Sequence, residues 1–164
     1  MSSWRIVFSR QAQKDAKKLA AYLGERARGG AGLIVTGGFS PDRSGRLTPR
    51  GSQADARTLH AHELITREVH EADGRIVLQL LHAGRYAFHP LSASPSGGKS
   101  PLSPFRSRRL TRSGVQRTID HFAEAARRAV DAGYEELIHT HVDAPAAVGD
   151  GVVKLPAWGY AVLA

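Results

Sequence analysis

An α/β fold is the class that this sequence predicts, on three observations. Short apolar runs alternate with segments of helical periodicity, the runs are rich in β-branched residues, and glycines separate the two kinds of segment. Strands that alternate with helices pair in parallel through right-handed crossovers. We therefore expect a partial TIM-type barrel of about four parallel βα units, half the number in a complete barrel.

The chain begins with a β-prone stretch at 4–8, followed by a segment at 11–28 that is typical of an amphipathic helix. Apolar residues recur there at helical spacing and lysines occupy the other face: Ala12, Ala16, Leu19 and Leu23 against Lys14, Lys17 and Lys18. Gly29 and Gly30 end the helix.

A second strand and helix follow. The run 32–36 is apolar, which is typical of a parallel strand buried on both faces, and it ends at Gly37 and Gly38. Residues 55–71 form a helix with Leu59, Leu64, Ile65 and Val69 facing inward, and the next strand is expected at 75–81.

Residues 89–114 are rich in Pro, Ser, Gly and Arg, which indicates a long loop. Thr111 or Ser113 caps a third helix that ends at Gly133. The expected apolar stripe of this helix is Ile119, Phe122, Ala123, Ala126 and Val130. A fourth strand is expected to start over 134–138, the tail 138–164 has no assignment, and we expect one domain over 1–164.

Composition narrows the functional classes. The apolar fraction of 41% and charged fraction of 23% are those of a soluble globular protein. The chain contains no cysteine, which excludes disulfides, iron–sulfur clusters and cysteine zinc sites. No signal-peptide or membrane-spanning run is present, so we expect a cytoplasmic protein without a membrane partner.

Three segments carry a resemblance to a known family: LAAYLGERARGGAGLIVTGGFSPDRSGRLTP, VHEADGRIVLQLLHAGRYAFHP and IDHFAEAARRAVDAGYEEL. Together, residues 20–137 or so resemble the N-terminal part of the flavin barrel of the old yellow enzyme and NADPH 2,4-dienoyl-CoA reductase family. The resemblance implies FMN as cofactor and NADPH as reductant. It places Gly37 and Gly38 close to the flavin ring, has Gln79 hydrogen-bond the flavin pyrimidine, and assigns His82 and Arg85 to the adjacent loop or to substrate.

The sequence departs from that family after Tyr134. EELIHTHVDAPAAV stands where the family has a glycine-rich turn and a proton-donating tyrosine, and Tyr160 lies too late to replace that tyrosine. The family's flavin-phosphate site belongs to later barrel strands. We therefore assign no catalytic residue, and we expect weak FMN binding with little or no turnover. His139, His141 and Asp143 alternate as metal ligands would on a strand, but no further ligands accompany them, and we assign no metal site.

A second resemblance covers residues 3–20, SWRIVFSRQAQKDAKKLA, which look like the start of a RelE/ParE-family toxin. Two family fragments followed by an unrelated tail indicate a gene fusion, a frameshifted relic or an artificial sequence. The alternative function is a non-enzymatic toxin–antitoxin component that binds protein or RNA. Open sheet edges favour a homo-oligomer or a protein partner.

The excess of basic residues allows two interpretations of the surface. The net charge of +8 and the pI near 10.4 are compatible with a polyanion partner or with a basic solvated surface. The densest basic stretch, Arg106, Arg108, Arg109 and Arg112, suits a CoA phosphate, RNA, an acidic partner or a mobile solvated loop.

Overall fold

The structure is a computed structural model that describes residues 10–135, 138–140, 147–149, 152–154 and 161–163. The chain divides into two compact units, Met1–Tyr134 and Glu135–Ala164, and each is described by itself. The single domain expected over 1–164 stays a prediction. The expected strand at 4–8 lies outside the described residues.

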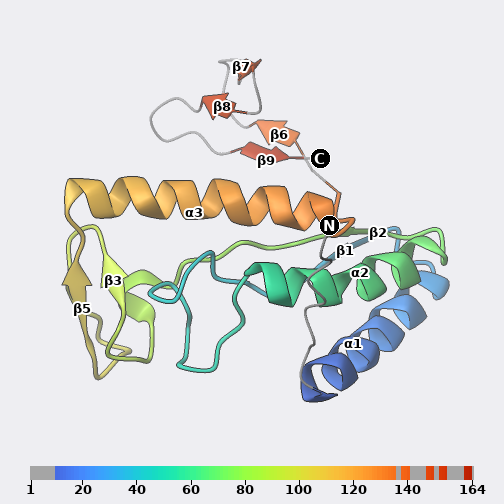
Figure 1. The fold of residues 1–164 in the computed structure, drawn as a ribbon, viewed down its shortest axis with the longest axis horizontal. Helices are drawn as coiled ribbons and strands as arrows, with labels where there is room; N and C mark the ends of the chain where they lie inside the picture. Colours follow the sequence, from blue (N-terminus) through green and yellow to red (C-terminus); the bar gives the residue numbers. More distant parts are fainter. Residues whose placement is uncertain (1–9, 136–137, 141–146, 150–151, 155–160, 164) are drawn as a thin grey trace, which may run out of the picture. The chain divides into compact units, whose positions relative to one another are not determined.

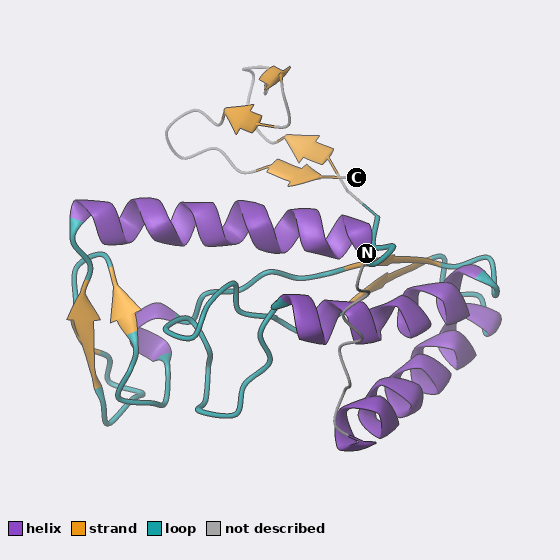
Figure 2. Cartoon of the chain, viewed as in Figure 1, coloured by secondary structure: helices purple, strands orange, loops and turns teal. Residues whose placement is uncertain are grey.

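A βαβ unit forms the centre of the first unit (Figure 1). Strand β1 (Leu33–Val35) pairs in parallel with β2 (Arg75–Val77), Ile34 opposite Ile76, and helix α2 (Ala56–His70) connects them. Helix α1 (Arg10–Arg28) packs against α2 (Figure 2). The apolar faces of the helices and strands meet in one core, whose most buried large side chains are Leu59, Ile65, Val69 and Ile76.

The two N-terminal helices follow the sequence pattern closely. In α2, Leu59, Ile65 and Val69 are buried as expected, and Leu64 is partly buried. The Asp55 side chain caps the helix by accepting a hydrogen bond from Thr58 N at 2.8 Å. Such a cap satisfies one of the free N–H groups of the first turn, which explains why the helix begins there.

The segment expected as a long loop contains regular structure. After the 3₁₀ helix η1 (Gly84–Tyr86), three short strands form a sheet in the order β3-β5-β4, with β5 parallel to β3 and antiparallel to β4. Their bounds are β3 Ala93–Ser94, β4 Gly98–Lys99 and β5 Arg106–Arg109. Buried serines replace an apolar core here: Ser103 Oγ donates to Ala87 O at 2.7 Å, and Ser107 Oγ donates to Ser94 Oγ at 3.2 Å. The long loop expected over 89–114 was therefore wrong in part. The expectation was based on composition, because serine-rich segments are typical of loops.

Helix α3 (Arg112–Asp131) begins where expected but turns a different face inward. Its buried residues are Gly114, Ala125 and Ala129, whereas Ile119 and Val130 of the predicted stripe are 55% and 41% exposed. The helix carries two apolar faces, and the alanine face is the one that packs close to the core. The buried face is therefore centred on the alanines beside the predicted stripe, of which Phe122 and Ala126 are partly buried.

The run at 32–36 was expected to form a strand buried on both faces, and this expectation is wrong. Leu33 and Val35 of β1 are 48% and 58% exposed, since no described element covers their side of the sheet. Within the described residues, β1 and β2 are the parallel strands joined by a helix, so the count of about four βα units is not confirmed.

The second unit contains antiparallel pairs. Strand β6 (Ile138–Thr140) pairs with β9 (Ala161–Leu163), and β7 (Ala147–Gly149) pairs with β8 (Val152–Lys154). The strand expected to start over 134–138 thus begins at Ile138, and its described partner is antiparallel. In the described parts of the chain, no helix combines the length and the apolar character needed to cross a bilayer.

Candidate functional site

Beyond their last residues, β1 and β2 continue side by side into loops. Thr36 Oγ1 accepts a hydrogen bond from Gln79 N at 3.1 Å and donates to Gly37 O at 2.9 Å. Phe39 N then donates to Gln79 O at 2.8 Å, and Leu81 N donates to Phe39 O at 2.9 Å. The segment after β1 therefore bulges outward at Gly37 and Gly38. It then returns at Phe39 to pair with the segment after β2.

The two glycines differ in what surrounds them. A Cβ at Gly37 would meet no atom within 4 Å, so the backbone there lies uncovered. A Cβ at Gly38 would come within 2.8 Å of Leu81 Cδ2, so this position has no room for a side chain. Gln79 is exposed next to them, and its carboxamide makes no hydrogen bond with any residue that the structure describes. The structure thus brings Gly37, Gly38 and Gln79 to one edge.

His82 is held against the loop that follows the glycines. Its Nδ1 accepts from Gly84 N at 3.1 Å, which leaves the ring proton on Nε2, 3.4 Å from Ser44 Oγ and 3.8 Å from Asp42 Oδ1. Burial lowers the pKa of His82, although the Asp42 carboxylate partly offsets this effect. His82 is therefore neutral near pH 7 and positions the loop.

Arg85, the remaining expected residue, is exposed on η1. Its guanidinium lies 6.0 Å from the centroid of the Tyr86 ring, at the outer limit of a cation–π contact. It has no ion pair with the described residues. The side chain is therefore available to a ligand.

Sequence reasoning missed Asp42, which organises the loop. Its Oδ1 accepts from Ser44 N at 2.8 Å, Ser44 Oγ at 2.7 Å and Gly45 N at 3.0 Å, and its Oδ2 lies 3.0 Å from His121 Nδ1 on α3. Burial raises the pKa of Asp42, but the hydrogen bonds from His121, Ser44 and Gly45 outweigh it, and the pKa falls below its ordinary value. The Pro-Asp-x-Ser-Gly pattern at 41–45, typical of a turn, was the available signal.

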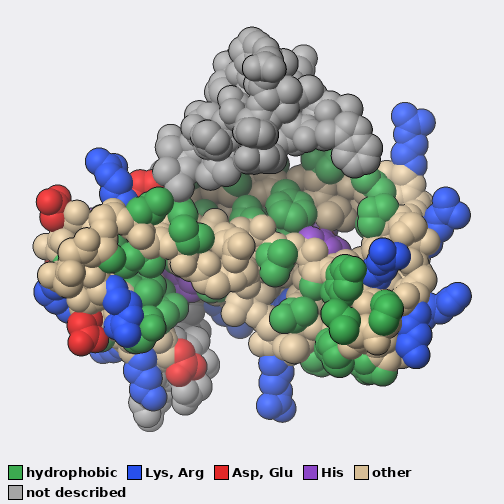
Figure 3. All heavy atoms as spheres, turned by 180° about the vertical axis from the view of Figure 1, so that it is seen from behind, with side chains coloured by type: hydrophobic (Ala, Val, Ile, Leu, Met, Phe, Trp, Pro, Cys, Tyr) green, Lys and Arg blue, Asp and Glu red, His purple; other side chains and the backbone are tan. Residues whose placement is uncertain are grey.

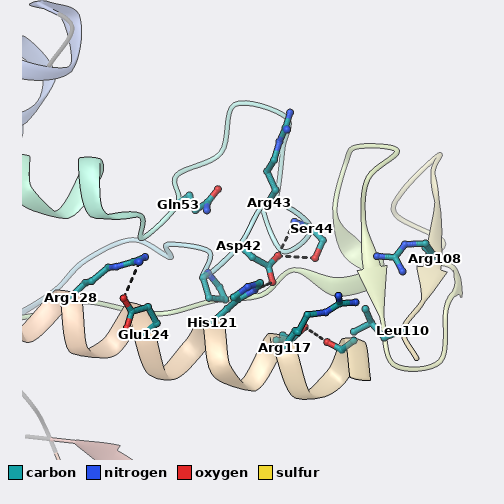
Figure 4. A pocket seen from close by; sticks show the side chains of 13 residues that line it. Asp42, Arg43, Ser44, Gln53, Arg108, Leu110, Arg117, His121, Glu124 and Arg128 are labelled. Carbon is teal, nitrogen blue, oxygen red and sulfur yellow. Dashed lines mark hydrogen bonds and ion pairs between the residues drawn. The ribbon is translucent and has the colours of Figure 1, made fainter. Parts of the chain in front are cut away.

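Beside this loop lies a hollow of about 580 Å³, drawn in Figure 4. It is lined by the loop, by the end of β5 and by one side of α3 from Gly114 to Arg128, and the lining includes Asp42, Arg43, Arg108, Arg117 and His121. None of the residues expected to contact a flavin lines it. The glycine edge and the hollow are therefore separate features.

Comparison with known proteins identifies the family. The sequence profile of the NADH:flavin oxidoreductase / NADH oxidase family matches residues 5–141. A metal reductase of Desulforamulus reducens is 35% identical over 125 residues, which cover 72% of this chain and 18% of that protein. An NADPH dehydrogenase of Bacillus subtilis is 29% identical over 138 residues, covering 76% of this chain and 38% of that protein.

Solved structures agree on the fold. The old yellow enzyme homologue of Zymomonas mobilis is similar with a TM-score of 0.64 and 26% identity, over 72% of this chain and 37% of that chain. Morphinone reductase has a TM-score of 0.67 at 23% identity, over 73% of this chain and 37% of that chain. The described fold is thus part of an old yellow enzyme-type α/β barrel.

These matches bear on the two resemblances of the sequence. The family profile begins at residue 5 and so includes most of the segment that looks toxin-like, and the toxin resemblance and a composite origin gain no support. The chain spans about a fifth to two fifths of the length of the curated relatives it matches. The family and its structural neighbours imply FMN binding. The chain therefore belongs to the NADH:flavin oxidoreductase / NADH oxidase family.

Proposed function

We propose that this chain supplies the ring-binding edge of a flavin oxidoreductase site, formed where β1 and β2 end. The observation that carries the proposal is the uncovered backbone at Gly37 beside the unengaged carboxamide of Gln79. A flat aromatic ring needs backbone without side chains on one side and a donor–acceptor group at its polar rim, and this edge offers both. The residues present therefore fit an isoalloxazine ring.

Each residue has a distinct part in this proposal. Gln79 donates to and accepts from the pyrimidine rim of the ring, and Gly37 and Gly38 allow the backbone to approach its face. The Thr36 hydroxyl, which accepts from Gln79 N, holds the two strand ends in register. His82 positions the adjoining loop, and Arg85 contacts cofactor or substrate from the solvent side. FMN, when bound, supplies hydride transfer from NADPH to an acceptor.

The 164-residue chain assayed by itself is proposed to bind FMN weakly and to support little or no NADPH-dependent reduction of enones. Ring contacts are neutral, whereas the phosphate of the cofactor needs cationic donors that the family resemblance places on later strands. Contacts to the ring alone do not supply the free energy that cationic donors contribute when they bind the phosphate, so the affinity for FMN is low.

The test is an FMN titration followed by flavin fluorescence. We expect a dissociation constant in the micromolar range or weaker, and a further loss of about tenfold in Gln79→Leu, because one or two ring hydrogen bonds disappear. Gln116→Leu, an exposed glutamine on α3, is the matched control and leaves affinity unchanged. Stoichiometric FMN in the purified protein would contradict weak binding, and equal affinity of Gln79→Leu and the parent chain would remove Gln79 from the site.

A further inference from the structure

The hollow between the loop at 40–45, the end of β5 and helix α3 has an unusual charge balance. Four arginines line it: Arg43, Arg108, Arg117 and Arg128. Two carboxylates line it as well, Asp42 and Glu124. The charge of a ligand that binds here therefore depends on which of these arginines and carboxylates already form ion pairs with each other.

Both carboxylates are fully engaged. Asp42 accepts from Ser44, Gly45 and His121. Glu124 pairs with Arg127 Nη2 at 2.8 Å and with Arg128 Nη2 at 2.9 Å, so Arg128 has an ion-pair partner. Figure 4 shows the pair of Glu124 with Arg128. Neither carboxylate forms an ion pair with one of the other three arginines that line the hollow.

Three guanidinium groups remain. Arg43, Arg108 and Arg117 make no ion pair or hydrogen bond through their side chains with the residues that the structure describes. Figure 4 shows the Arg108 side chain extending from β5 and the Arg117 side chain extending from α3 at the same end of the hollow. Unpaired cations that line one concave space repel each other, and an anion between them removes that cost.

We propose that this hollow binds a small phosphate-bearing ligand, with a phosphoryl group held between Arg108 and Arg117. Guanidinium groups present planar pairs of donors that match phosphate oxygens, and they remain charged at every physiological pH. A volume of about 580 Å³ is that of a small-molecule site, larger than a lone phosphate requires. The ligand is therefore a diphosphate or a nucleotide, and binding does not depend on FMN.

Isothermal titration calorimetry of the full chain with inorganic pyrophosphate tests the proposal at two salt concentrations. We expect saturable binding of one pyrophosphate per chain, weakened at least about tenfold in Arg108→Gln and in Arg117→Gln, because each removes a charge-assisted pair. Arg117→Lys keeps the charge without the planar donor pair and gives an intermediate loss.

Arg106→Gln is the matched control. Arg106 is exposed on the same strand as Arg108 but does not line the hollow, and its removal lowers the net charge by the same amount. Affinity for pyrophosphate changes less than twofold in this variant. A second titration with ADP separates the sources: tighter binding of ADP than of pyrophosphate indicates a nucleotide, and equal binding indicates the phosphate alone.

Three results would overturn the proposal. The first is the absence of saturable pyrophosphate binding to the parent chain at low salt. The second is an equal loss of pyrophosphate affinity in Arg106→Gln, Arg108→Gln and Arg117→Gln. The third is tighter binding of a single-stranded oligonucleotide that all three variants weaken alike. The second and the third would each assign the basic residues to a diffuse polyanion surface. FMN affinity of the same variants, read by fluorescence, shows separately whether the ring-binding edge is intact.

Discussion

His62 shows how burial changes the chemistry of a single residue. The side chain is 6% exposed, lies edge-on to Phe39 with ring centroids 5.0 Å apart, and its Nδ1 is 2.7 Å from the Tyr134 hydroxyl. Burial lowers the pKa of His62 from 6.5 to about 4 and raises that of Tyr134. His62 is therefore neutral in the folded chain, where it joins α2 to the residues after α3.

Acid is expected to destabilise the chain through His62. Between pH 6.5 and pH 4 the unfolded state binds a proton that the folded state does not, so stability is complete above pH 6.5 and falls as the pH falls. The loss is roughly 2 kcal/mol by pH 5. Urea unfolding at pH 7 and pH 5 measures it, and His62→Gln should lose that part of the dependence.

His60→Gln serves as the control for this experiment. His60 is exposed on the same helix with Nδ1 2.6 Å from Glu63 Oε1, so its replacement shows the effect of removing an exposed histidine from α2. If parent chain and His62→Gln lose the same stability between these pH values, another group causes the acid sensitivity.

At the level of elements, the start of α3 depends on one cap. Thr111 and Ser113 were equal candidates in the sequence, and the structure selects Thr111, whose Oγ1 accepts from Gly114 N at 3.1 Å. Gly114 is buried at the helix start, next to the Leu110 side chain. The cap therefore sets both the first turn of α3 and the position of Arg117 one turn later.

Thr111→Ala is expected to destabilise the chain by about 1 kcal/mol, because an N–H of the first turn loses its partner. Ser113→Ala removes a neighbouring exposed hydroxyl and should change stability by less than about 0.5 kcal/mol. Thermal unfolding followed by circular dichroism compares the two variants. A larger effect of Ser113→Ala would mean that the helix begins later than the structure shows.

For the whole molecule, exposed apolar side chains predict association. Leu33 and Val35 on β1 and Leu81 after β2 are 48%, 58% and 45% exposed. Figure 3 shows hydrophobic side chains at the surface among projecting lysines and arginines. Because apolar strand faces and open strand edges favour further pairing, we expect a homo-oligomer or a protein partner.

Size-exclusion chromatography with light scattering tests this expectation. The parent chain should elute as a dimer or larger species, and Val35→Lys should shift it toward the monomer, because a charge on the apolar strand face must be desolvated on association. Leu102→Lys, which changes a 69% exposed leucine in a turn, is the control and should leave the distribution unchanged. A monomeric parent chain would contradict the prediction.

The sequence by itself determined the local features of this protein. Helical periodicity located α1, α2 and α3 almost to the residue, and the resemblance to a flavin family singled out Gly37, Gly38 and Gln79, whose contact with a flavin ring is our proposal. These signals are readable because helix periodicity, capping and strand ends depend on residues that are close neighbours in the chain.

The tertiary structure alone decided the rest. Asp42 and His121 are 79 residues apart, and His62 and Tyr134 are 72 apart, yet each pair is in hydrogen-bond distance. Likewise, α3 buried a face centred on the alanines beside the predicted stripe, and arginines from a loop, a strand and a helix came to line one hollow. Periodicity reveals that a helix has an apolar face, but which face is buried, and which charges stay unpaired, depends on close packing between distant segments.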